Sequence, residues 1–218
     1  MEELIKVSEI FRSIDGEGIR TGYPVTFIRL YGCNLKCSYC DSSYATTYGD
    51  YTLMSISDIV EHVDYFGLHR ITLTGGEPLA CDQCYDLVTA LTDAGYEVNI
   101  ETNGSLSILP YVDMKNVILT MDYKCPSSNM EDRMNRLNLP LLRSKDVLKF
   151  VVGSKLDLST MLAVVNGYDI SANIFVSPVF GEIDPKEIVD FLICNEVENV
   201  RIQLQLHKII WDPNMRGV

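Results

Sequence analysis

The sequence lacks long apolar runs and has few basic residues. Its 218 residues contain no uninterrupted apolar stretch of the roughly 20 residues that a membrane-spanning helix needs, and the first residues lack the basic flank and apolar run of a signal peptide. Only 18 Lys and Arg accompany 30 Asp and Glu, and the formal net charge of −12 is the wrong sign for tracking a phosphate backbone. We therefore expect a cytoplasmic protein that acts on neither a membrane nor a nucleic acid.

The composition is that of a globular chain. Apolar residues make up 47% and charged residues 22% of the sequence, which excludes a disordered, collagen-like or coiled-coil protein. Neither an internal repeat nor a domain boundary is visible. We expect a single domain over residues 1–218.

Strand and helix patterns alternate along the chain. Apolar, β-branched runs occur at residues 26–31, 70–74, 97–101, 117–122, 147–152, 173–177 and 200–204, and helical patterns at 57–66, 79–94, 156–166 and 184–194. Because parallel strands need crossover connections that cover the sheet, this order predicts an α/β fold with a parallel sheet, open or curled into a partial barrel. Seven strands are too few for an eightfold barrel. The polar stretch 123–143 is expected to hold one short helix.

Three of the seven cysteines, Cys33, Cys37 and Cys40, follow the first predicted strand on one loop. Thiolates at this spacing can converge on zinc or an iron–sulfur cluster. A structural zinc or an electron-transfer cluster takes four protein ligands, whereas a cluster held by three leaves one iron open to a reactive molecule. A structural zinc completed by a distant Cys81, Cys125 or histidine is the alternative.

Polar segments follow most of the other predicted strands. Since ligands bind at the carboxyl ends of parallel strands, we expect these segments to share one site. They are Gly75-Gly76-Glu77-Pro78, Thr102-Asn103-Gly104, Asp122-Tyr123-Lys124, Ser177-Pro178 and Gln205-Leu206-His207-Lys208. A glycine-flanked acidic loop at residues 13–18 precedes the first of these strands.

Two motifs carry a family resemblance. The spacing Cys33-x3-Cys37-x2-Cys40, with Tyr39 before the last cysteine, and Gly75-Gly76-Glu77-Pro78 one strand–helix unit later resemble the radical S-adenosylmethionine superfamily. Within it, five further features resemble the 7-carboxy-7-deazaguanine synthase family: Asp15-Gly16-Glu17-Gly18, the run 29–37, Cys40-Asp41-Ser42, Thr74, and Gln205-Leu206-His207-Lys208. The resemblance runs from about Phe11 to the last residue and implies a partial, incomplete parallel β/α barrel that is reduced in helices.

The resemblance implies a 4Fe–4S cluster and S-adenosylmethionine as cofactors. The cluster on Cys33, Cys37 and Cys40 would chelate S-adenosylmethionine through its open iron and cleave it by one-electron reduction to a 5'-deoxyadenosyl radical. Glu77 would pair with the methionyl ammonium group, and Gly76 would contact the same moiety through its main chain. The expected neighbours of the adenine and ribose are Tyr39, Asp122, Tyr123 and Lys124.

The implied reaction is the radical ring contraction of 6-carboxy-5,6,7,8-tetrahydropterin to 7-carboxy-7-deazaguanine with release of ammonia, in queuosine- or archaeosine-type biosynthesis. Glu17 would accept N–H groups of the pterin, Arg29 would hold its carboxylate, and His207 completes the expected catalytic set. Ser42 takes the place of a hydroxyl ligand for Mg2+. Further substrate contacts are expected from the extension at residues 1–22 and the following strands, namely from Ile14, Asp15, Gly16 and Thr74.

The resemblance also implies a flavodoxin- or ferredoxin-like electron donor and a homodimer. One alternative is an activase that takes hydrogen from a glycine of a partner protein, which shares the cysteine loop and Gly-Gly-Glu-Pro but has no evident need for the acidic loop. A second alternative is a non-enzymatic iron–sulfur or zinc module, which predicts four thiolate ligands.

Several single residues have simpler interpretations. Arg29 could be an internal salt-bridge partner of Glu17, and His62 and His69 are expected to be surface or core histidines. Cys81 and Cys84 are three residues apart on a predicted helix and therefore share a face. They could be an auxiliary metal or redox pair, or ordinary buried thiols.

Overall fold

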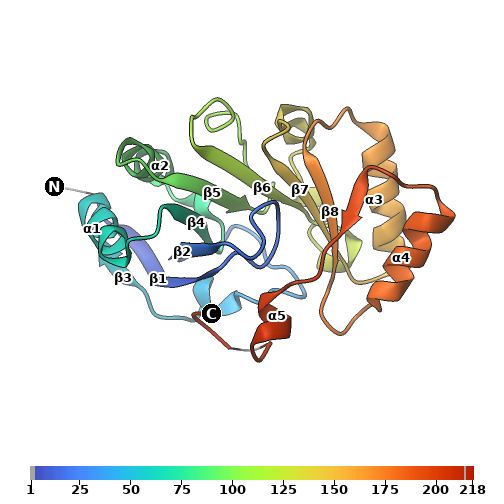
Figure 1. Cartoon of the computed structure of the whole chain (residues 1–218), viewed down its shortest axis with the longest axis horizontal. Helices are drawn as coiled ribbons and strands as arrows, with labels where there is room; N and C mark the ends of the chain where they lie inside the picture. The colour runs from blue at the N-terminus through green and yellow to red at the C-terminus, as the bar shows by residue number, and fades with distance from the viewer. Residues whose placement is uncertain (1–2, 214) are drawn as a thin grey trace.

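The computed structural model describes residues 3–213 and 215–218. Over these residues, nine strands form one sheet in the order β3-β1-β2-β4-β5-β6-β7-β8-β9. Seven of the strands run parallel: β2 (Pro24–Leu30), β4 (Arg70–Gly75), β5 (Glu97–Thr102), β6 (Val117–Tyr123), β7 (Val147–Val152), β8 (Asn173–Pro178) and β9 (Val200–Ile202). The sheet curls but does not close, because β3 and β9 remain its two edges (Figure 1).

The predicted parallel strands and the partial barrel are confirmed, and the structure adds two antiparallel strands. β1 (Ile5–Ile14) pairs with β2 on one side and with β3 (Thr52–Met54) on the other. The residues expected only as an extension therefore form an integral strand, with Ile5 and Val7 buried and Lys6 between them exposed. This alternation is the period of a half-buried strand.

The four predicted helices are present as α1 (Ile56–Phe66), α2 (Cys84–Asp93), α3 (Lys155–Gly167) and α4 (Pro185–Cys194), and a short α5 (His207–Ile210) follows β9. A capping box between Ser55 and Asp58 begins α1, and Asp184 caps α4. The helix predicted at 79–94 is divided, because a separate 3-10 helix, η2 (Pro78–Ala80), precedes α2. Within the described residues, no helix has the length and apolar character needed to span a membrane.

The expectation of one short helix within residues 123–143 is wrong. The segment contains three 3-10 helices, η3 (Pro126–Ser128), η4 (Glu131–Arg133) and η5 (Arg136–Leu141). Asn129 adopts a left-handed φ of 59° directly after η3, and Pro140 lies inside η5. Both features interrupt a continuous α-helical hydrogen-bond ladder.

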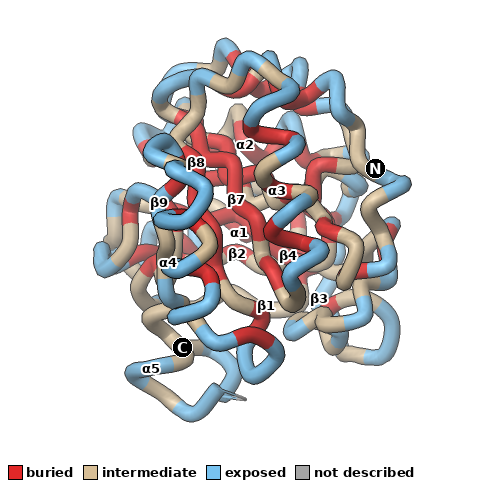
Figure 2. Tube along the Cα trace, turned by 90° about the vertical axis from the view of Figure 1, so that its right-hand side faces the viewer, coloured by how far each residue is buried: buried red, intermediate tan, exposed pale blue. Residues whose placement is uncertain are grey.

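The two faces of the sheet have different chemistry. On the outer face, alternate residues such as Ile71 and Leu73 of β4 pack with the helices in the hydrophobic core. The positions between them carry polar side chains, including Thr72, Asn99 of β5 and Lys149 of β7, which are themselves buried. Buried residues follow the strands, and exposed residues lie on the loops and the outer sides of the helices (Figure 2). The polar face therefore forms the inside of the partial barrel.

The loop at residues 15–23, between β1 and β2, extends toward the segment that follows β9 (Figure 1, dark blue). Gln203 accepts a hydrogen bond from the Gly18 N–H at 2.6 Å and donates to the Thr21 hydroxyl at 2.6 Å. The Leu206 N–H donates to the Gly16 carbonyl at 3.1 Å. These bonds join the two ends of the curled sheet, so the loop spans part of the gap that the missing barrel strands leave.

Candidate active site

Two glycines allow the end of β4 to lie directly against the end of β2. A Cβ atom on Gly75 would stand 2.2 Å from the Leu30 carbonyl oxygen, and one on Gly76 would stand 2.1 Å from the Gly32 carbonyl oxygen. The Gly76 N–H donates to Leu30 at 3.2 Å, and the Glu77 N–H donates to Gly32 at 2.9 Å. The turn that carries Glu77 and the start of the cysteine loop are therefore one packed unit.

The cysteine loop presents three free thiols, and each of Cys33, Cys37 and Cys40 is partly exposed. Burial raises the pKa of Cys33 and Cys37, and the proximity of Cys40 raises both further, so the three sulfurs lie in one electrostatic environment. Among the described residues, no three His, Cys, Asp or Glu side chains are close enough to hold a single metal ion. A 4Fe–4S cluster takes its thiolates on separate irons, so three clustered, accessible thiols fit it without meeting at one ion.

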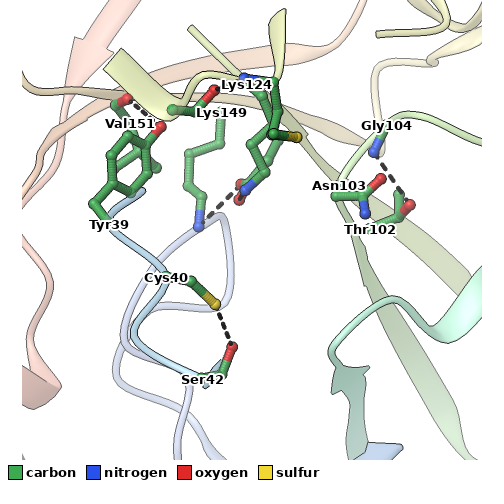
Figure 3. A network of polar contacts seen from close by, with 12 residues as sticks. Tyr39, Cys40, Ser42, Thr102, Asn103, Gly104, Lys124, Lys149 and Val151 are labelled. Atoms are coloured by element: carbon green, nitrogen blue, oxygen red, sulfur yellow. Dashed lines mark hydrogen bonds and ion pairs between the residues drawn. The ribbon is translucent and has the colours of Figure 1, made fainter. Parts of the chain in front are cut away.

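Glu77 is a buried carboxylate with neutral partners. Its side chain accepts hydrogen bonds from the Leu79 N–H at 3.0 Å, the Thr102 hydroxyl at 2.7 Å and the Asn103 N–H at 2.6 Å. Burial raises the pKa of Glu77 to about 7, although these hydrogen bonds oppose the shift. A carboxylate so placed fits an amino group brought by a ligand, as the predicted contact with S-adenosylmethionine requires. Thr102 and Asn103 stand opposite the cysteine loop (Figure 3).

The predicted cofactor residues at the end of β6 lie on two different faces. Asp122 forms an ion pair with Lys124 at 2.8 Å on the inner face. Tyr123 is only 1% exposed, and its ring packs in the core at a tilted angle, with its centroid 5.3 Å from that of Phe150. The structure therefore does not bring the Tyr123 side chain to the site, because successive side chains alternate along a strand. Tyr39 does reach it, and its hydroxyl donates to the Val151 carbonyl at 3.2 Å (Figure 3).

Glu17 is held in the partial barrel by three donors. It accepts from the Lys149 ammonium at 3.0 Å, the Ser177 hydroxyl at 2.8 Å and the Gln205 amide at 3.1 Å. Burial opposes the charge of Glu17, but the attraction of Lys149 and the hydrogen bonds lower its pKa overall. Glu17 is therefore an anion at neutral pH.

Lys149 links Glu17 to Asp122, one of the residues expected to lie beside S-adenosylmethionine. Its ammonium lies 3.2 Å from Asp122 as well as 3.0 Å from Glu17. Burial opposes the charge of Lys149, but Asp122 and Glu17 raise its pKa well above the usual value. Figure 3 shows Lys149 reaching into the space that Cys40 and Lys124 border. Sequence reasoning missed this residue, although a lysine inside an otherwise apolar strand was a usable signal.

Arg29 is positioned by Glu9, and its alternative pairing with Glu17 is wrong. The Arg29 Nε donates to the Glu9 carboxylate at 2.7 Å, and the Tyr44 hydroxyl donates to the same oxygen at 2.7 Å. The rings of Phe11 and Tyr44 lie 5.9 and 5.8 Å from the guanidinium. Among the described residues, the two terminal amino groups of Arg29 have no hydrogen-bond partner, which leaves one edge for a planar anion.

Apart from the Glu17 side chain, the acidic loop contributes to the site through its backbone. The Asp15 carboxylate accepts a hydrogen bond from Arg20 at 2.7 Å and one from the Thr72 hydroxyl at 2.6 Å. Its oxygens are therefore already bound by partners within the protein. A Cβ atom on Gly16 would stand 2.3 Å from the His207 Nδ1, which shows that the ring packs on the Gly16 backbone. Burial lowers the pKa of His207 although Glu17 opposes this, so the ring is neutral at pH 7.

The remaining predicted residues lie around this cluster. Thr74 pairs across the strands with Arg29 and hydrogen-bonds to Glu101, another inner-face carboxylate that sequence reasoning missed. Ile14 ends β1 opposite Pro24. The Ser42 hydroxyl lies 3.8 Å from the Cys40 sulfur (Figure 3).

A three-cysteine loop packed against a Gly-Gly-Glu turn inside a partial parallel barrel defines the class of the protein. Residues 27–192 match the Radical SAM superfamily, and the chain belongs to it. Its fold is similar to the crystal structure of QueE from Escherichia coli, with a TM-score of 0.77 over 94% of this chain and 95% of that one at 22% identity. Members of the superfamily use a 4Fe–4S cluster and S-adenosylmethionine, which the thiols and Glu77 fit.

Full-length relatives define the family within this class. The chain is 46% identical to the 7-carboxy-7-deazaguanine synthase of Clostridium acetobutylicum, over 98% of its own length and 99% of that protein. It is 41% identical to the enzyme of the same name from Methanospirillum hungatei, over 96% of this chain and 86% of that one. The chain therefore belongs to the 7-carboxy-7-deazaguanine synthase family, as its motifs predicted. This membership favours the ring-contracting enzyme over the activase and the non-enzymatic module.

Proposed function

We propose that this chain converts 6-carboxy-5,6,7,8-tetrahydropterin to 7-carboxy-7-deazaguanine with release of ammonia, in queuosine- or archaeosine-type biosynthesis. The names of its full-length relatives support this reaction. The observation that carries the proposal is the pair Glu17 and Arg29. One is a buried anion that accepts N–H groups, and the other a guanidinium with a free edge. Together they match the two ends of a carboxylated pterin.

The chain's own residues orient the substrate between these two ends. Arg29 binds the carboxylate of the substrate, and Glu9 keeps the guanidinium in place. Glu17 accepts from the pterin edge, and the neutral His207 beside Gly16 adds a donor or an acceptor. The backbone of residues 14–16 and the hydroxyl of Thr74 provide further polar contacts. Held in this way, the reacting carbon stays in a fixed position throughout the reaction.

The second half of the site serves the cofactors. When bound, the cluster on Cys33, Cys37 and Cys40 together with S-adenosylmethionine supplies the radical that removes hydrogen from the substrate. Glu77 and the main chain of Gly76 hold the methionyl group, and the side chains facing its nucleoside are Tyr39, Asp122 and Lys124.

Ser42 offers a hydroxyl oxygen for Mg2+ beside the cluster loop. Its oxygen lies 3.8 Å from the Cys40 sulfur, so a cation held by Ser42 would lie beside the cysteine loop. Mg2+ takes few protein ligands and keeps positions for water and substrate oxygens, which suits a single serine.

The proposal also covers the domain organisation, the location and the partners of the enzyme. A single domain is supported by one continuous sheet from β3 to β9. A cytoplasmic location is supported by the free state of all seven cysteines, since a reducing compartment keeps thiols unpaired. A flavodoxin- or ferredoxin-like protein donates the electron, and two copies of the chain form a homodimer.

An anaerobic turnover assay tests the reaction. The reconstituted enzyme receives S-adenosylmethionine, Mg2+, a reductant and either 6-carboxytetrahydropterin or tetrahydropterin without the carboxylate, and products are identified by mass. We expect 7-carboxy-7-deazaguanine from the carboxylated pterin alone, with many products for each S-adenosylmethionine consumed. Failure to form a deazaguanine would refute the proposed reaction. The many-products expectation rests on the return of hydrogen to the 5'-deoxyadenosyl fragment, which regenerates S-adenosylmethionine after each turnover. A one-to-one stoichiometry would refute this regeneration.

A further inference from the structure

Cys81 and Cys84 lie directly behind the turn that carries Glu77, and the proposed reaction does not use them. Cys81 is the C-cap residue directly after η2, and its N–H donates to the Pro78 carbonyl at 3.1 Å. Cys84 is the first residue of α2. The two cysteines therefore occupy the joint between the Glu77 turn and the helix that follows it.

The backbone places the two cysteines at disulfide distance. The Cys84 N–H donates to the Cys81 carbonyl at 3.0 Å, which closes a four-residue turn over residues 81–84. Such a turn brings its end Cα atoms within about 7 Å, and disulfides span Cα distances of about 4.4–6.8 Å. Burial, with a smaller contribution from the neighbouring Cys81, raises the pKa of Cys84 to about 12, so the two thiols influence each other. A bridge needs rotation of side chains and little movement of the backbone.

The two thiols differ in access. Cys81 is half-buried and contacts only the Gln83 amide oxygen at 3.6 Å among its described hydrogen-bond partners. Cys84 is 1% exposed and hydrogen-bonds to Tyr111. An external reagent can therefore reach Cys81 but not Cys84. A disulfide sulfur can still accept from the Tyr111 hydroxyl, so oxidation leaves no buried polar group unpaired at this point.

We propose that Cys81 and Cys84 form a reversible dithiol–disulfide site that exchanges with small disulfides such as oxidised glutathione, independently of the cluster. The Cys81 thiolate attacks one glutathione sulfur, forms a mixed disulfide and releases one glutathione. The Cys84 thiolate then attacks the Cys81 sulfur, forms the internal disulfide and releases the second glutathione. Two electrons pass from the cysteine pair to oxidised glutathione, and the two thiol protons end on the released glutathiones.

The burial of the two thiols determines how stable their disulfide is and how fast it exchanges. Low thiol pKa values stabilise the reduced form of strongly oxidising cysteine pairs, whereas burial raises the pKa of both Cys81 and Cys84. The thiolates of this pair are not stabilised, so the reduced form gains no advantage over the disulfide. Because a thiolate must attack, exchange is slow at neutral pH and faster at higher pH. Closing the ring stiffens the link between η2 and α2, which begins three residues beyond the Pro78 that follows Glu77.

Alkylation and mass spectrometry test this site in the holoenzyme. A Cys194→Ser background removes an exposed, isolated thiol. The protein is equilibrated anaerobically with glutathione buffers of increasing oxidised fraction, quenched with acid, alkylated with N-ethylmaleimide and digested. We expect the peptide with Cys81 and Cys84 to lose both alkylation adducts together and to gain an internal disulfide, while the iron content stays constant.

Single substitutions separate the two steps of the exchange. Cys84→Ser should stop at a glutathione adduct on Cys81, and Cys81→Ser should leave Cys84 without an adduct because it is buried. Three results would overturn the proposal. They are a wild-type peptide alkylated at both cysteines at every ratio, a stable glutathione adduct on Cys81 without internal disulfide, and a disulfide that appears only in step with loss of iron. Each readout is independent of catalytic turnover.

Discussion

Replacing Lys149 with methionine removes a buried positive charge that stands between two carboxylates. The ammonium lies 3.0 Å from Glu17 and 3.2 Å from Asp122, and the lysine is 7% exposed. Methionine fills a similar volume, so the change acts mainly on charge. Breaking a buried ion pair by removing one partner typically costs about 3–5 kcal/mol, because the remaining charge is left without compensation. In a domain of this size that corresponds to a fall in Tm of roughly 6 to 20 °C.

The loss of stability in Lys149→Met should change with pH in a defined direction. In the wild type, the pKa of Glu17 is lowered, so its ionisation stabilises the fold above the unfolded pKa of 4.5 and is lost as pH falls through the lower folded pKa. Without Lys149, burial raises the pKa of Glu17, and the folded state then holds a proton that the unfolded state releases. Stability of the variant therefore increases as pH falls from neutral toward 4.5. The gap in Tm between the two proteins narrows over this range.

Thermal unfolding of the anaerobic holoenzymes between about pH 6 and pH 8, followed by tryptophan fluorescence, measures both effects. Lys186→Met is the matched control, because Lys186 pairs with Asp190 on the exposed side of α4. An exposed helical pair of this kind contributes about 0.3–0.5 kcal/mol. The reasoning is refuted if Lys149→Met lowers Tm no more than Lys186→Met does, or if the gap widens on acidification.

Three further substitutions test the site. Cys40→Ala should lose the cluster iron and all cleavage of S-adenosylmethionine, whereas Cys194→Ala on the exposed end of α4 should keep both in iron and sulfide analysis; full iron in the Cys40 variant would contradict its role as a ligand. Gly16→Ala should displace the His207 ring and reduce kcat/KM by up to about 100-fold with an unchanged Tm, and wild-type kinetics would show that the ring position does not matter. Arg29→Lys keeps the charge but loses the planar fork, so substrate binding should weaken by about 1.5–3 kcal/mol, roughly 10- to 150-fold. Unchanged affinity in equilibrium binding would count against the carboxylate contact.

Most of the fold could be predicted from the sequence because the signals are local. The apolar runs of β4 to β8 and the caps of α1 and α4 lie within short windows. β1 was not predicted, since its alternation is weak beyond Val7, where the residues are only partly buried on both faces. The division of 79–94 into η2 and α2 follows from Cys81, whose extended backbone, with φ of −85° and ψ of 122°, ends η2 before α2 begins at Cys84.

The site was predictable where its residues are contiguous. The cysteine loop and the Glu77 turn each form within one segment, so their spacing predicted the chemistry. The position of Tyr123 could have been predicted, since Asp122 and Lys124 flank it on a strand and must face the other way. The partners of Glu17 could not, because Lys149 and Gln205 approach it only through the curvature of the sheet, from 132 and 188 positions away.

The hydrogen bonds between Gln203 and the loop at residues 15–23 have a consequence for the order of folding. Gly18 and Gln203 are 185 positions apart, so the bond between them closes almost the whole chain into one loop. During synthesis the amino-terminal part leaves the ribosome first, and β2 to β7 can bury their apolar outer face against α1, α2 and α3 before β9 exists. The loop that carries Glu17 stays without its carboxyl-terminal partners until then. Maturation of the substrate pocket is therefore a late, non-local step, whereas the cysteine loop and its Gly-Gly-Glu turn can be complete on the nascent chain.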